Sequence, residues 1–152
     1  MPKINLPPWS EKAPGPNPLT GQDDGPYAEI VLGDVVGITQ FGARLERLSP
    51  GSRSSHRHWH ETEDELVYVL AGELVLVEDE ETVLLAGDVA GWKAGVPAAH
   101  CLENRSEEDA VLLVVGTRFD HGVVHYPDHD VILRHDADGK TFTRSDGTPI
   151  ER

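Results

Sequence analysis

Residues 57–65 read Arg-His-Trp-His-Glu-Thr-Glu-Asp-Glu, and this stretch decides the fold prediction. Side chains alternate across a β-strand, so His58 and His60 share one face while Trp59 takes the other. The two imidazoles, about 6.5–7 Å apart along the backbone, can close on one metal ion. A turn then brings Glu65 to the start of the next strand, where its carboxylate supplies a further ligand.

A fourth candidate ligand follows a glycine-rich stretch at residues 87–97, which leads into a predicted strand with His100 and Asn104. Three histidines and one carboxylate on inward faces form a costly buried polar cluster unless they bind a metal. Neutral imidazoles and a carboxylate suit Fe, Mn, Ni, Zn or Cu, and the sequence does not choose among them. The alternative is a polar strand face that pairs histidine with glutamate in the core.

The surrounding sequence predicts an all-β sandwich or barrel, because short runs of Val, Leu and Ile alternate with Gly, Pro, Asp and Asn. The first 26 residues include seven prolines and predict an extended arm that Trp9 can anchor on its own domain or on a neighbouring subunit, with a loosely ordered tail as the alternative. Residues 27–152 predict a single domain. Residues 131–150 predict a final hairpin with turns at Asp138-Gly139 and Asp146-Gly147. The other predicted strands are 28–32, 37–48, 53–60, 65–70, 73–78, 81–85, 90–92, 99–104 and 110–117.

The spacing of these residues resembles the two motifs of the cupin superfamily. The first motif corresponds to His58, His60, Glu65 and Gly72, and the second to Gly87, Gly95, His100 and Asn104. The chain departs from the second motif at Lys93, where proline is usual, and by two extra residues before His100. The resemblance implies a cupin-type, jelly-roll-like double-stranded β-barrel that holds one divalent transition-metal ion through His58, His60, Glu65 and His100. More narrowly, the chain is similar to small bacterial stand-alone cupins, a mostly unassigned group in which some members are labelled sugar-phosphate isomerases.

Composition excludes several classes of function. The 152 residues include 27 Asp and Glu against 13 Lys and Arg, and the net charge of -14 disfavours nucleic acid as a partner. No apolar run approaches the ~20 residues that span a membrane, and the sequence begins without an apolar signal core, so we expect a cytoplasmic protein. The single cysteine, Cys101, excludes an internal disulfide and is expected to be a buried thiol that faces away from the metal.

The remaining histidines and aromatic residues are expected to have other roles. His56 is predicted at the solvent rim of its strand, with a base near the metal or an extra ligand as the alternative. His121, His125 and His129 are predicted in an exposed acidic loop, since Gly122 and Pro127 argue against a helix. Packing roles are expected for Trp59, Tyr68 and Trp92.

Two functional hypotheses follow. The first is a metal-dependent enzyme, an isomerase, lyase or dioxygenase, that acts on a small oxygen-rich molecule such as a sugar or organic acid. His56 or Asn104 would then move a proton, and the candidate cations for an anionic substrate are Arg44, Arg53, Arg57 and Arg105. The second hypothesis is a non-catalytic module that binds a small ligand or stores the metal. A homodimer is also predicted, because strands 66–70 and 74–77 are apolar on both faces.

Overall fold

The computed structural model describes residues 3–152, which are almost entirely β-structure with one five-residue helix, α1 (Leu32–Val36), and one 3-10 turn, η1 (Pro127–His129). The predicted all-β class is confirmed. The strands are β1 (Ser10–Lys12), β2 (Tyr27–Ile30), β3 (Phe41–Leu48), β4 (Trp59–His60), β5 (Glu65–Ala71), β6 (Glu73–Val77), β7 (Glu81–Leu85), β8 (Val89–Trp92), β9 (Cys101–Glu103), β10 (Ala110–Thr117), β11 (Gly122–Tyr126), β12 (Val131–Asp136) and β13 (Gly139–Thr143).

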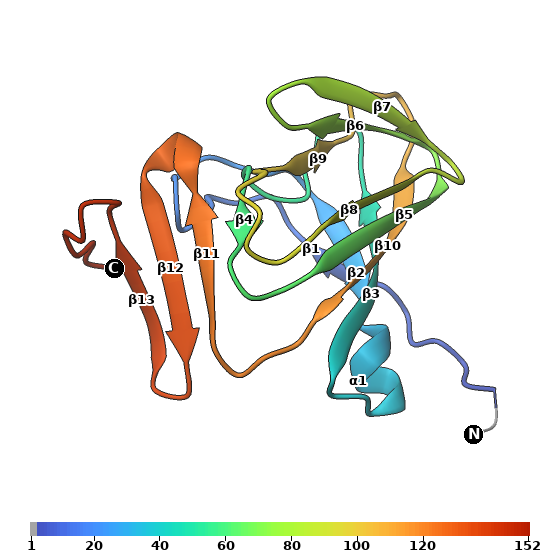
Figure 1. Ribbon diagram of the computed structural model, residues 1–152. Helices are drawn as coiled ribbons and strands as arrows, with labels where there is room; N and C mark the ends of the chain where they lie inside the picture. The colour runs from blue at the N-terminus through green and yellow to red at the C-terminus, as the bar shows by residue number, and fades with distance from the viewer. Residues whose placement is uncertain (1–2) are drawn as a thin grey trace.

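The strands form three antiparallel sheets, and they do not close into one continuous barrel within residues 3–152 (Figure 1). The largest sheet has the order β1-β2-β3-β10-β5-β8, and β10 lies at its centre. A second sheet has the order β7-β6-β9, and a third has the order β13-β12-β11-β4. Because β3, β10, β5 and β8 are neighbours in one sheet, residues far apart in the sequence share its inner face.

The hydrophobic core lies between the largest sheet and the β7-β6-β9 sheet. Leu48, Val67 and Leu112 project from the first, and Leu74 and Leu102 project from the second. These five side chains are at most 3% exposed, and they close one end of the space between the sheets. The tight connection between β5 and β6 depends on Gly72, whose φ is 80° and where a Cβ atom would lie 2.7 Å from the carbonyl oxygen of Asp109.

The C-terminal hairpin is confirmed, since β12 pairs with β13 around the turn at Asp138-Gly139. The predicted exposed loop around His121, His125 and His129 is wrong for two of the three residues. His125 lies in β11, which pairs with β4 and β12, and His129 lies half-buried in η1. Five residues of extended chain suffice for a strand here because both neighbouring strands satisfy its backbone hydrogen bonds.

Residues 53–60 do not form one continuous strand as predicted. Only β4 is regular, and upstream of it the backbone makes isolated bridges at Arg53 with Glu103 and at His58 with His100. The helix α1 was not predicted, although Gly37 ends it in the left-handed conformation typical of a helix C-terminus.

The N-terminal segment packs on its own chain. β1 pairs with β2 as an edge strand, and the half-buried Trp9 ring lies 5.0 Å from the Arg47 guanidinium. Among residues 3–152, no helix has the length and apolar character needed to cross a bilayer.

Candidate metal centre

A cavity of about 420 Å³ opens on the inner face of the largest sheet, and the predicted ligands line it. Its walls come from β3, β5, β8 and β10, and the segment that contains His58 and His60 lies across from them. Leu102 and Leu112 close its apolar end. The four predicted ligands, His58, His60, Glu65 and His100, therefore share one enclosed space, and we call them the cavity cluster.

The main chain sets the spacing of two of these ligands. The backbone N–H of His58 donates to the carbonyl oxygen of His100 at 3.1 Å, and the N–H of His100 donates to the carbonyl oxygen of His58 at 3.0 Å. This reciprocal pair places the two residues side by side, and their rings lie 4.9 Å apart. Both side chains consequently point toward Glu65, at the start of β5.

Three imidazole nitrogens converge on one oxygen atom. Glu65 Oε2 lies 3.1 Å from His100 Nε2, 3.5 Å from His60 Nε2 and 3.7 Å from His58 Nε2. Ligand atoms of His58, Glu65 and His100 all lie within 4.8 Å of one another. His60 adjoins this trio but does not meet the same distance limit, so the structure gathers three of the predicted ligands tightly and the fourth at their edge.

The hydrogen bonds of Nδ1 in His58 and His100 show which nitrogen of each ring is available to a metal. His58 Nδ1 lies 2.9 Å from the carbonyl oxygen of His56, and His100 Nδ1 lies 3.0 Å from that of Ala98. A carbonyl oxygen only accepts hydrogen bonds, so each Nδ1 must be the protonated nitrogen. Each Nε2 therefore donates a hydrogen bond to Glu65 only when it is protonated as well, and in the neutral ring it presents a lone pair to a cation bound between the imidazoles and the carboxylate. The donor set and its outer hydrogen bonds therefore fit a divalent metal.

The pKa values of Glu65 and His60 are shifted in opposite directions. Burial by itself would raise the pKa of Glu65, but the hydrogen bonds with His100, His58 and His60 hold that pKa well below its usual range. Burial lowers the pKa of His60, but Glu63 and Glu65 outweigh it and raise the pKa to about 9. His60 Nδ1 lies 3.2 Å from Glu63 Oε2 without hydrogen-bond geometry, and it is the one fully buried side-chain polar atom without a partner among residues 3–152.

Aromatic residues support the cavity cluster. Trp92 stacks on His100 with ring centroids 3.5 Å apart and an interplanar angle of 5°, and its indole N–H donates to Glu78 at 2.7 Å. The predicted packing role of Trp92 is confirmed, although the residue also lines the cavity. Tyr126 lines the cavity too, with its ring 5.7 Å from that of His58.

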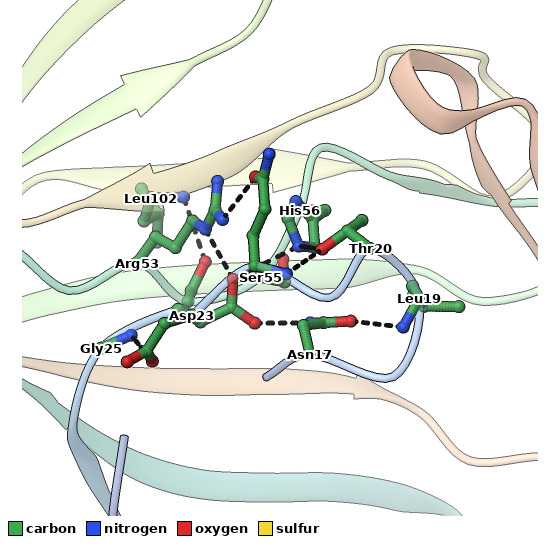
Figure 2. Close-up of polar contacts among 12 residues, drawn as sticks. Asn17, Leu19, Thr20, Asp23, Gly25, Arg53, Ser55, His56 and Leu102 are labelled. Atoms are coloured by element: carbon green, nitrogen blue, oxygen red, sulfur yellow. Dashed lines mark hydrogen bonds and ion pairs between the residues drawn. The ribbon is translucent and has the colours of Figure 1, made fainter. Parts of the chain in front are cut away.

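His56 is not a residue of the solvent rim, which corrects the sequence prediction. It is 3% exposed and lies beneath the N-terminal segment, where Nε2 contacts Thr20 Oγ1 at 2.9 Å (Figure 2). Its Nδ1 lies 3.1 Å from His129 Nε2, and Asp24 Oδ1 is 3.4 Å from its Nε2. We call Thr20, Asp24, His56 and His129 the arm cluster. The side chain of His56 does not line the cavity, and only its carbonyl oxygen reaches the cavity cluster, through His58.

Asn104 is also excluded from the cavity and does not serve the predicted role in proton transfer. Its amide nitrogen donates to the carbonyl oxygens of Leu48 and Glu108, and its Oδ1 accepts from Ser106, so it holds the turn before β10. Cys101 is buried as predicted, and burial raises the pKa of its thiol to about 12.

Of the four arginines proposed from the sequence, only Arg44 lines the cavity. Arg53 pairs with Asp24, Arg57 pairs with Asp128, and Arg105 pairs with Glu81 outside it. Arg118 lines the cavity and was not predicted, because its position just after β10 has no signal in the sequence.

Comparison with known proteins agrees with this geometry. The model of the cupin domain matches residues 44–116. A crystal structure of a sugar phosphate isomerase from a cupin superfamily, from Silicibacter pomeroyi, is 41% identical and superposes with a TM-score of 0.88 over 99% of this chain and 97% of that one. The chain belongs to the cupin superfamily. No curated protein matches this cupin.

Two further solved structures resemble this cupin less closely. A protein from Acidithiobacillus ferrooxidans, described provisionally as a sugar phosphate isomerase, is 31% identical with a TM-score of 0.77 over 84% of this chain and 81% of its own. A protein from Thermotoga maritima, described as a predicted oxalate decarboxylase, is 28% identical with a TM-score of 0.54 over 62% of this chain and 83% of its own.

Proposed function

We propose that this cupin is a metal-dependent isomerase that interconverts small hydroxy-carbonyl compounds of the sugar class. The observation that supports this function best is the convergence of three histidine Nε2 atoms on Glu65 Oε2 inside the cavity. His58, His60, Glu65 and His100 would hold one divalent ion, and Fe, Mn, Ni, Zn and Cu all suit these ligands. The names of two similar proteins support isomerisation over the other reactions.

The bound ion would act as a Lewis acid toward a carbonyl or hydroxyl oxygen of the substrate. The residues of the chain supply binding and orientation. A cavity of about 420 Å³ is within the usual range for small-molecule sites. Burial, and after it Glu65, raises the pKa of Tyr126 to about 12, so its hydroxyl stays protonated and can donate a hydrogen bond to a substrate oxygen.

Isomerisation suits this site because the reaction needs no second reactant. A proton leaves the hydroxyl-bearing carbon next to the carbonyl, and the electron pair forms the enediol double bond while the carbonyl oxygen gains a proton. The former carbonyl carbon is then protonated, and the hydroxyl of the neighbouring carbon loses its proton to become the new carbonyl. The net change moves a hydrogen between adjacent carbons and involves no oxidant or reductant. Each proton needs an acid or base within hydrogen-bond reach of the substrate in the cavity.

The decisive experiment is turnover by the metal-reconstituted protein. The full chain is stripped with chelator, reloaded with each ion in turn, and assayed by proton NMR on aldoses, ketoses and their phosphates in heavy water. We expect deuterium to enter at the carbon next to the carbonyl, and we expect His60→Ala to lose both metal and turnover. Full turnover by a metal-free His60→Ala protein would refute the metal-dependent function.

The same assay separates the other candidate functions. Reaction only on carboxylic acids, or only with dioxygen, would identify a lyase or a dioxygenase in place of the isomerase. Tight binding of ligand and metal with no turnover on any substrate would identify a binding module. A cytoplasmic location, the homodimer and the absence of nucleic acid as a partner stay predictions.

A further inference from the structure

We propose that Arg44 is an anion-binding residue of the cavity, so that the ligand has a phosphate or carboxylate group at its β3 end. This inference rests on the proposed function, because it names the substrate class of the same site. Arg44 lines the cavity, and 48% of its side chain is exposed. Its Nε lies 2.7 Å from Glu46 Oε1, and the two residues project from the same face of β3.

The terminal nitrogens of Arg44 have no partner among the residues that the structure describes. Within residues 3–152, neither Nη atom donates a hydrogen bond to any acceptor, although a guanidinium has five N–H groups in a fixed fork. The other arginine of the cavity differs, because Arg118 Nη1 donates to Asp34 Oδ1 at 3.1 Å. Both outer nitrogens of Arg44 are therefore available to a ligand, whereas Asp34 already engages one of the two outer nitrogens of Arg118.

The carboxylates that line the cavity already have partners. None of them is therefore left to accept hydrogen bonds from the outer nitrogens of Arg44. Glu65 faces the three histidines, Glu63 lies 3.2 Å from His60, and Glu46 faces Arg44. Asp64 accepts from the backbone N–H of Ala94 at 2.8 Å. The lining has more carboxylates than arginines, so the place for an anionic group is local to the outer nitrogens of Arg44.

Glu46 fixes the orientation of the guanidinium. It is 5% exposed, and the residue that pairs with it on β10 is the fully buried Leu112. A carboxylate in this position keeps the Nε edge of Arg44 against the wall of the cavity and leaves the two Nη groups for the ligand. Glu46 is thus a positioning residue that acts through Arg44.

Gly42 leaves space on β3 next to Arg44, whereas a Cβ atom at Gly116 would lie 2.9 Å from the carbonyl oxygen of Asp64. Glu65 pairs with Gly116 on β10, and Gly116 pairs with Gly42 on β3, so all three residues share one row across the sheet. Both glycines line the cavity, and a Cβ atom at Gly42 would have only the carbonyl oxygen of Gly116 within 4 Å, at 3.8 Å. A ligand can therefore extend along β3 from the metal ligands to Arg44.

The fork of a guanidinium matches two oxygens of one carboxylate or phosphate group. Both groups have the same recognition chemistry, and a phosphorylated sugar and a sugar acid each combine such a group with hydroxyl or carbonyl oxygens for the cavity cluster. The site thus selects anionic, oxygen-rich molecules over neutral sugars.

The test is anion binding by the metal-free full-length protein, because chelation removes both turnover and binding of the anion to metal. Calorimetric titrations with inorganic phosphate and with acetate show whether the site binds a phosphate group or a carboxylate group. Arg44→Gln combined with Glu46→Gln replaces the ion pair by two neutral amides and leaves no unpaired buried charge. We expect this double variant to bind the anion at least about 10-fold more weakly.

Arg105→Gln is the matched control, because Arg105 pairs with Glu81 outside the cavity, and it should bind the anion as the wild type does. Circular dichroism checks that each variant is folded. If the double variant does not fold, Arg44→Lys replaces it in the test, because lysine keeps the charge but has no fork of N–H groups. Binding of neither anion to the wild type, unchanged binding in a folded Arg44 variant, or loss of binding in Arg118→Gln alone would overturn the assignment. Inactivity on every sugar would refute the proposed isomerase and leave this anion-binding result unaffected.

Discussion

His56 and His58 are two residues apart, yet they belong to clusters with opposite electrostatics. In the arm cluster, burial and the nearby Arg53 guanidinium lower the pKa of His56 against the opposing effect of the Asp24 carboxylate, and its hydrogen-bond partners are a hydroxyl and a second imidazole. In the cavity cluster, the imidazoles face the Glu65 carboxylate, and the pKa of His60 is raised. The hydrogen-bond partners of a histidine, rather than its position in a motif, decide whether it can hold a cation.

The largest expected effect separates the two clusters by metal affinity. Glu65→Gln keeps the shape of the side chain but removes the charge at the point where the imidazoles converge, so we expect metal to bind more than about 100-fold more weakly. His129→Gln, in the arm cluster, should leave the affinity unchanged. Equilibrium dialysis with elemental analysis measures both variants. Equal metal content in the two would contradict the assignment of roles.

The pH dependence of the metal-free protein gives a second test. Because the pKa of His60 rises from 6.5 to about 9 on folding, its contribution to stability is complete below pH 6.5 and is lost as the pH rises through 9. This rise corresponds to roughly 3 kcal/mol. Urea unfolding between pH 6 and 9.5 in chelator should show the loss, and Glu63→Gln should reduce it. Stability that increases over this range would refute the prediction.

A smaller effect is expected for Ser55, which lines the cavity beside His58. Ser55 Oγ lies 3.1 Å from His58 Nδ1, which also contacts the carbonyl oxygen of His56. Ser55→Ala removes one of these two contacts, so we expect metal affinity to fall about 10-fold. Calorimetric titration with Zn²⁺ checks this value. An unchanged affinity would show that the carbonyl oxygen alone orients the ring.

The smallest effect tests whether the arm cluster is purely structural. Thr20→Val removes the hydroxyl that contacts His56 Nε2, and we expect the free energy of unfolding to fall by about 1 kcal/mol. Metal affinity should stay at the wild-type value. A large loss of metal affinity in this variant would show that the two clusters are coupled through the backbone of His56 and His58.

Sequence reasoning predicted the features that depend on local patterns. The alternation around His58 and His60, the hairpin glycine at Gly72 and the turn at Asp138-Gly139 all have local causes, and the structure has them where they were predicted. The family match supports the barrel class, and the metal assignment itself stays a proposal.

The errors have a common physical cause, because the roles involved depend on contacts between distant segments. His56 is buried because residues 17–24 cover it, and no pattern near His56 reports that contact. His125 lies in a strand because β4 and β12 pair on either side of it. Arg44 faces the cavity while Arg105 does not, a difference that appears only once β3 has been placed in the sheet.

The reciprocal backbone pair between His58 and His100 has a consequence for ion selectivity. Since the main chain fixes the separation of two ligands during folding, binding an ion requires little further ordering of either residue. If a metal binds here, we expect an ion too large for this spacing to bind weakly, because the two backbone segments cannot move apart without breaking their hydrogen bonds.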